Sequence, residues 1–156
     1  MLPAIRMVLM AARKSFSPTY QLPSTESINS TAPEGETSDA QYIFNTDGTI
    51  QERKDNAVGG TTLSTSASSP WSDDPAEDGV GKYVRMTYLG GDADRRTDAL
   101  GTGWLQLNSQ RIFTFQESDT GGPYSYTPTY TVDISLDGST VHDTQTLSVT
   151  LGNEGP

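Results

Sequence analysis

The sequence predicts an all-β protein, a β-sandwich of the immunoglobulin-like or jelly-roll type with an extended N-terminal arm. Three observations predict it. From about Gln41 onward, short alternating apolar and polar runs recur between tight-turn residues. No amphipathic helical pattern occurs after residue 14. Between Ser15 and Ala40 the chain is rich in Pro, Ser and Thr, with single, unperiodic apolar residues, which is typical of a segment that does not form a core.

Residues 1–40 are interpreted as an anchoring arm in two parts. Met1–Lys14 has Pro3 in a first-turn position, apolar residues near helical spacing, and two basic residues where a helix C-terminus favours positive charge. Such a short helix is not stable alone in water, so we expect it to dock on a partner; the alternative is a frayed chain end. The predicted docking residues are Leu2, Ile5, Val8 and Leu9. Ser15–Ala40 is interpreted as an extended, proline-stiffened tether.

Residues 41–156 are expected to form the sandwich from seven or eight strands. Asp47-Gly48 and Asp137-Gly138 each stand between two strand-like runs, and an Asp-Gly in that place is a strong hairpin signal. The clearest central strand is Lys82–Leu89, and Thr61–Ser69 is interpreted as a weak edge strand or a loop. The other predicted strands are Tyr42–Phe44, Thr49–Arg53, Trp104–Leu107, Arg111–Phe115, Tyr130–Leu136 and Val141–Leu151.

The two tryptophans, Trp71 and Trp104, are the predicted centre of the core. A buried tryptophan is among the largest apolar groups that a core can hold, and its truncation to alanine costs about 3–5 kcal/mol of folding free energy. Trp104→Ala is therefore expected to be strongly destabilising.

Charge and composition argue against several classes of protein. Lys and Arg number 10 against 20 Asp and Glu, a formal net charge of −10, which opposes binding to nucleic acid or to an anionic membrane surface. No apolar run approaches the ~18 residues of a membrane span, so no membrane insertion is expected. The charge order of Met1–Ala12 does not fit a secretory signal peptide, so this segment is expected to be retained. Because the chain has no Cys and one His, His142, neither a thiolate metal site nor a multi-histidine site is available within it.

No constellation of residues predicts an enzyme. Gly79–Lys82 lacks the spacing of a phosphate-binding loop, and Asp92-Ala93-Asp94 has a metal-binding form that is common by chance. The acidic loop Asp73–Asp78 offers oxygens for calcium without an EF-hand order, and a solvated loop is the preferred interpretation. We therefore predict no catalytic residue, no metal and no cofactor.

The strongest candidate for binding is a cluster of tyrosines near one predicted loop. Tyr124, Tyr126 and Tyr130 lie around Pro123 and Pro128. Tyrosines in the loops of a sandwich make good recognition surfaces, because each offers a large contact area at a small entropic cost. The alternative is that these side chains pack an edge strand.

The stretch Tyr42–Leu151 resembles small β-sandwich structural proteins encoded in the tail modules of tailed bacteriophages and prophages. The residues that carry the resemblance are Phe44–Thr49, Lys82–Thr87, Gly103–Leu107 with Arg111–Phe115, and Tyr130–Leu136. The resemblance implies a non-enzymatic virion component near the tail tip, fibre or collar, and it carries over no catalytic residue.

Two classes of function remain open at this point. In the first, the arm anchors the chain to other virion proteins, tail or capsid subunits, and the sandwich projects as a homo-oligomer. A capsid decoration protein is the nearest variant. In the second, the chain is a carbohydrate- or receptor-recognition module that contacts the host surface.

Overall fold

The structure is a computed structural model that describes residues 22–156, except 48, 57–59 and 66–81. The predicted docking residues Leu2, Ile5, Val8 and Leu9 lie outside the described residues. Trp71 and the acidic loop Asp73–Asp78 also lie outside them.

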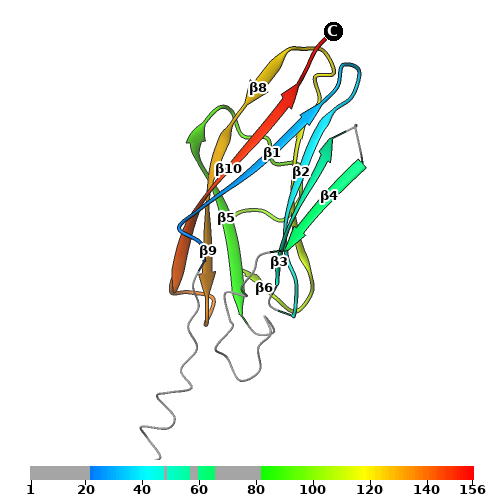
Figure 1. The fold of residues 1–156 in the computed structure, drawn as a ribbon. Helices are drawn as coiled ribbons and strands as arrows, with labels where there is room; N and C mark the ends of the chain where they lie inside the picture. The colour runs from blue at the N-terminus through cyan, green and yellow to red at the C-terminus, as the bar shows by residue number, and fades with distance from the viewer. Residues whose placement is uncertain (1–21, 48, 57–59, 66–81) are drawn as a thin grey trace, which may run out of the picture.

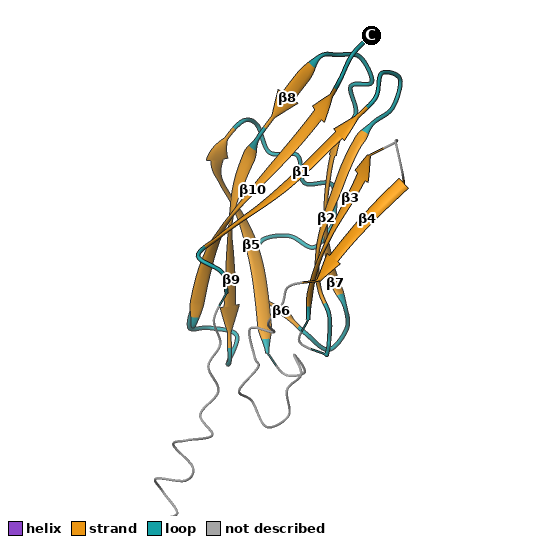
Figure 2. Ribbon diagram, in the orientation of Figure 1, coloured by secondary structure: helices purple, strands orange, loops and turns teal. Residues whose placement is uncertain are grey.

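The described chain is an all-β sandwich of two packed sheets, which confirms the predicted fold class (Figures 1 and 2). One sheet, called sheet A, has the strand order β1-β10-β9-β5-β6, and β8 also pairs with β10. The other, sheet B, has the order β4-β3-β2-β7. The strands of sheet A are β1 (Thr25–Ala32), β5 (Tyr83–Gly91), β6 (Leu105–Gln106), β8 (Tyr124–Tyr126), β9 (Pro128–Ser135) and β10 (Asp143–Asn153). Those of sheet B are β2 (Ser38–Phe44), β3 (Ile50–Asn56), β4 (Gly60–Thr65) and β7 (Arg111–Glu117). The described part of the chain has no helix, and so none that could cross a membrane.

The sandwich begins well before residue 41, so the predicted boundary of the arm is wrong. Strand β1 lies parallel to the last strand, β10, in a register that runs from Thr25 opposite Thr146 to Ala32 opposite Asn153. The predicted boundary between Ala40 and Gln41 falls inside β2, a strand at the centre of sheet B. Strand β1 escaped prediction because small and polar residues fill most of its inward positions, and its backbone is satisfied by a strand about 120 residues away in the sequence.

The hairpins and the central strand are confirmed. Strands β2 and β3 pair antiparallel on either side of the predicted Asp47-Gly48 turn, with Phe44 opposite Ile50, and Gly48 lies outside the described residues. Strands β9 and β10 pair around Asp137-Gly138. Strand β5 lies inside sheet A, between β9 and the two-residue edge strand β6. The stretch predicted as a weak edge strand begins with β4, which lies at the edge of sheet B.

The largest side chains of the core between the sheets are tyrosines and phenylalanines, which pack among aliphatic residues of both sheets. Tyr42, Phe44, Phe113, Phe115 and Tyr130 are each at most 1% exposed. The rings of Phe44 and Phe113 meet edge to face with their centroids 6.2 Å apart, and those of Phe115 and Tyr130 lie 5.0 Å apart. Such pairs stabilise a core beyond the area that they bury.

Trp104 is not at the centre of the core, and this prediction is wrong. The residue is half-buried, and the guanidinium of Arg85 stacks over its ring at 4.1 Å from the ring centroid. Trp104 therefore makes a cation–π contact at the surface, and we expect its truncation to cost less than a core position would.

Candidate recognition surface

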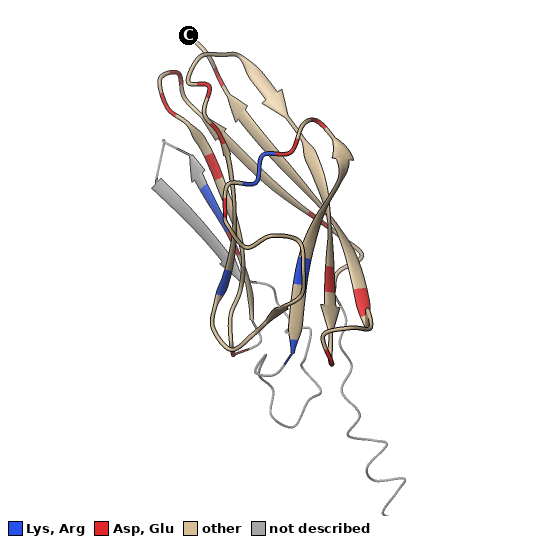
Figure 3. Ribbon diagram, turned by 180° about the vertical axis from the view of Figure 1, so that it is seen from behind, with Lys and Arg blue, Asp and Glu red and all other residues tan. Residues whose placement is uncertain are grey.

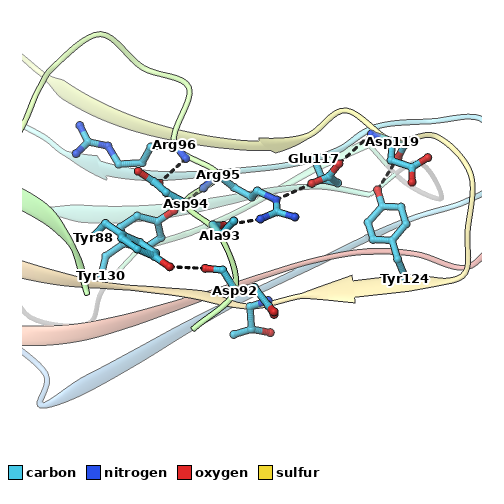
Figure 4. Close-up of polar contacts among 11 residues, drawn as sticks. Tyr88, Asp92, Ala93, Asp94, Arg95, Arg96, Glu117, Asp119, Tyr124 and Tyr130 are labelled. Atoms are coloured by element: carbon cyan, nitrogen blue, oxygen red, sulfur yellow. Dashed lines mark hydrogen bonds and ion pairs between the residues drawn. The ribbon is translucent and has the colours of Figure 1, made fainter. Parts of the chain in front are cut away.

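The segment between β5 and β6 crosses the molecule and joins the two sheets. It leaves sheet A after Gly91 and forms an antiparallel bridge between Arg96 and Phe115 of β7 in sheet B. Backbone hydrogen bonds on either side of this bridge, from Thr97 N–H to Thr114 O and from Gln116 N–H to Arg95 O, lengthen the contact. The chain then returns to sheet A as β6 (Figure 2). This crossing segment, residues 92–104, holds most of the polar contacts that Figure 4 shows.

A buried ion pair fastens the crossing segment. The guanidinium of Arg96 donates to both carboxylate oxygens of Asp98 at 3.1 and 2.6 Å. It also donates to the carbonyls of Met86 and Gly101. Burial of Asp98 on its own would raise its pKa, but the hydrogen bonds and charge of Arg96 and two backbone N–H donors outweigh this effect, so the pKa of Asp98 lies below its usual value. The pair joins the segment to β5.

The hydroxyl of Tyr130 on β9 is hydrogen-bonded to the start of the same segment. It accepts a hydrogen bond from the backbone N–H of Arg95 at 2.9 Å and donates to Oδ1 of Asp94 at 2.7 Å (Figure 4). The same carboxylate oxygen accepts from the N–H of Arg96. The pKa of Tyr130 lies well above that of an exposed tyrosine, and burial is the largest cause of this rise. The hydroxyl therefore stays protonated, and Asp94 has a structural role.

Tyr124 and Tyr126 form an aromatic pair at the end of the sandwich where β10 finishes. Their rings are stacked, with centroids 5.1 Å apart and planes 22° apart. The guanidinium of Arg95 lies over the ring of Tyr126, 4.5 Å from its centroid, and Arg95 Nε donates to Glu117 Oε2 at 2.6 Å. The hydroxyl of Tyr124 donates to the carbonyl of Asp119, which orients the outer ring (Figure 4).

A third tyrosine, the exposed Tyr88 of β5, contacts the crossing segment and the ring of Tyr130. Tyr88 is 39% exposed, and its hydroxyl donates to the carbonyl of Asp92 at 2.7 Å. Oδ2 of Asp92 accepts from the N–H of Thr127, which lies between β8 and β9. Tyr124 and Tyr126, called here the tyrosine surface, are held in place by the crossing segment through Arg95.

The structure separates the three predicted recognition residues. Tyr124 and Tyr126 come together, each half-buried. Tyr130 does not join them: it is 0% exposed and belongs to the core, so its assignment to the surface is wrong. Its place at the start of the alternating run of β9 pointed to this outcome, because alternate residues of a half-buried strand face the core. The role of Arg95 and Glu117 carried no signal in the sequence.

Charged residues on the described part of the chain are scattered (Figure 3). Three ion pairs use arginines: Arg85 with Asp133, Arg95 with Glu117 and Arg96 with Asp98. In the described ranges, no three His, Asp or Glu side chains lie close enough together to hold a metal ion. His142 is exposed in the turn between β9 and β10.

Comparison with known proteins adds no family to this description. No protein-family model matches the chain, and no curated protein sequence matches it.

Proposed function

We propose that the protein is a non-enzymatic structural component of a larger assembly, of the kind that tailed bacteriophages place near the tail tip, fibre or collar. In this proposal the N-terminal segment attaches the chain to neighbouring subunits. The sandwich projects from the point of attachment and presents the tyrosine surface.

The observation that carries the proposal is that Asp92, Asp94 and Tyr130 spend their polar groups on hydrogen bonds within the fold. Asp92 and Asp94, the pair with a metal-binding form, each accept backbone N–H groups that hold loops in place. The hydroxyl of Tyr130 is committed to two hydrogen bonds inside the fold. Groups that already satisfy one another stabilise a scaffold, whereas catalysis needs a nucleophile or an acid–base group directed at a substrate.

The direction of the strands supports an attachment point at one end of the sandwich and the tyrosine surface at the other. Strand β1 starts beside the middle of β10, opposite Thr146, and runs with it to Asn153, where β8 pairs. The first described residues therefore lie toward the end of the sandwich opposite to β8 (Figure 1). An attachment through the segment before residue 22 would leave the tyrosine surface facing outward.

The proposal is tested with the full chain and with two variants of it. The first variant carries Ile5→Asp and Leu9→Asp in the predicted docking segment. The control carries Leu89→Asp, which places the same charge on a leucine of the sandwich that is 59% exposed. Sedimentation velocity measures the mass of each protein, and thermal unfolding measures its stability.

We expect the wild type and the Leu89→Asp control to form the same defined oligomer. The docking variant should be a monomer whose sandwich still folds, because the two substitutions lie outside the residues that form the described strands. Equal masses for all three proteins would contradict attachment through the N-terminal segment. Truncation is better made before Leu22 than at residue 41, since removing residues 22–40 would delete β1 and part of β2.

A further inference from the structure

A hollow lined by both polar and apolar residues lies on sheet B. It has a volume of about 340 Å³, and its lining comes from β2, β3, β7 and the crossing segment. Ala40 and Tyr42 of β2 are buried in the core, so the alternate residues Asp39 and Gln41 point to the outer face of the sheet. The hollow is therefore an outer-face feature, and its size falls at the lower end of the ~300–1,000 Å³ that is usual for ligand sites.

The strand register brings four polar side chains into one row across this face. Gln41 pairs with Arg53 on one side and with Thr114 on the other. Thr97 of the crossing segment continues the row, since its N–H donates to the carbonyl of Thr114 and the two hydroxyl oxygens lie 3.0 Å apart. Neighbouring strands are about 4.8 Å apart, so the row presents a regular series of hydrogen-bonding groups.

Two of the side chains in the hollow are oriented by their neighbours. Asp39 accepts from Gln116 Nε2 at 2.7 Å and from Thr37 Oγ1 at 3.0 Å, so each carboxylate oxygen is held while keeping acceptor capacity. Gln41 Oε1 lies 3.5 Å from Arg53 Nη1, which is at the limit of a hydrogen bond. Arg53 is exposed, and its guanidinium carries five N–H donors, so it can donate to a ligand as well as to Gln41.

The mixture of groups selects the chemistry of a ligand. A cation alone would meet the guanidinium of Arg53, and an anion alone would meet the carboxylate of Asp39. An apolar ligand would bury these charges without partners, which is unfavourable. A neutral ligand that carries several hydroxyls can donate to Asp39 and Gln41 and accept from Arg53 at the same time.

We propose that this hollow binds a neutral oligosaccharide through Asp39, Gln41 and Arg53. The row of side chains along the sheet suits a linear chain of sugar rings that lies across β3, β2 and β7. The inference stands apart from the attachment role, because it concerns a different face of the sandwich and neither needs nor excludes an oligomer.

The test uses the uniformly labelled full chain and three probes: maltohexaose, chitohexaose and a mannohexaose, each titrated to millimolar concentration. Backbone amide chemical shifts report which residues respond. The variants Gln41→Ala and Arg53→Gln remove groups of the hollow. The control is Gln106→Ala, which removes the same side chain from an exposed position on β6, in the other sheet.

We expect at least one probe to shift the amides of Gln41, Arg53 and Thr114 in a saturable manner. Each hollow variant should weaken that binding by about tenfold or more, because each removes a polar contact to the sugar. The melting temperature of both variants should stay near that of the wild type, and the control should bind as the wild type does.

Two results would overturn the inference. One is the absence of shifts at these amides with all three probes. The other is binding that moves the amides of Tyr124 and Tyr126 instead and is unaffected by Arg53→Gln, which would place saccharide recognition on the tyrosine surface. Because the probes are added to a protein of known mass, neither result depends on whether the chain assembles.

Discussion

Replacement of Arg96 by methionine should destabilise the sandwich more than any change at an exposed arginine. Arg96 is 9% exposed and its partner Asp98 is 7% exposed. Methionine keeps much of the aliphatic stem and can still pack toward Phe113, whose ring lies 5.1 Å from the guanidinium carbon. The substitution therefore removes the charge and the hydrogen bonds while preserving most of the volume.

The size of the effect follows from what the substitution leaves behind. Asp98 would remain buried without its guanidinium partner, and breaking a buried ion pair from one side costs roughly 3–5 kcal/mol. The carbonyls of Met86 and Gly101 would each lose a donor, at 3.0 and 2.9 Å. Two backbone N–H groups would still donate to Asp98, which offsets part of the loss. We expect a decrease of about 3–4 kcal/mol in the free energy of unfolding.

The effect should also depend on pH, with a sign that the structure specifies. Asp98 has a lowered pKa in the folded wild type, so its contribution to stability is present above about pH 4 and is lost as the pH falls through the folded pKa. Without Arg96, burial raises the pKa of Asp98 above its wild-type value, so this carboxylate takes up a proton at a higher pH in the variant. Protonation removes the buried negative charge and with it part of the destabilisation. The difference in stability between the two proteins should therefore narrow as the pH is lowered.

Urea unfolding at neutral and acidic pH measures these quantities for Arg96→Met, Asp98→Asn and the double variant. The control is Arg111→Met, because Arg111 donates only to Gln106 and Asn108 in an exposed turn and should cost less than about 1 kcal/mol. The cycle should show a coupling of at least ~1 kcal/mol between Arg96 and Asp98. Additive single effects, or a loss for Arg96→Met no larger than for the control, would refute the assignment of this pair as the fastening of the crossing segment.

Three further predictions follow from single positions. Tyr130→Phe removes a buried hydroxyl that accepts from a backbone N–H at 2.9 Å and donates to a carboxylate at 2.7 Å. Urea unfolding should show a loss of about 2 kcal/mol in the free energy of unfolding. A loss no greater than that of Tyr88→Phe, at an exposed tyrosine, would contradict the structural role of the Tyr130 hydroxyl. Gly91→Ala places a Cβ 2.6 Å from a backbone oxygen at φ +81° and should lower the free energy of unfolding by at least about 2 kcal/mol. The control Gly103→Ala meets nothing within 4 Å and should leave the stability almost unchanged. Equal losses for the two variants would be inconsistent with this geometry. Asp137→Ala should lower the melting temperature at neutral pH, because backbone N–H donors in the turn lower the pKa of Asp137 and the carboxylate stabilises the hairpin above about pH 4. The difference in melting temperature between wild type and variant should vanish toward acid pH. A difference that stays constant with pH would contradict this role.

The parts of the fold that could be predicted are those in which neighbouring residues supply the physics. The Asp-Gly pairs marked the two hairpins because glycine readily adopts the positive φ that turns need, as Gly138 does at φ +79°. Alternation along β5 and β9 shows which residues face the core, since successive side chains of a strand point to opposite faces. The alternation of β9 also places Tyr130 on the inward face, although the clustering of tyrosines in the sequence predicted it on the recognition surface.

The remaining features depend on partners that are distant in the sequence. Strand β1 has little apolar content, and it is a strand because β10 completes its backbone hydrogen bonds. The half-buried Trp104 has Arg85 stacked over its ring, and Arg95 reaches Tyr126 because the crossing segment pairs with β7. The polar row in the hollow likewise exists only through the register of three strands. Local sequence thus specifies turns and faces, whereas the pairing of distant strands decides where the arm ends and which side chains meet.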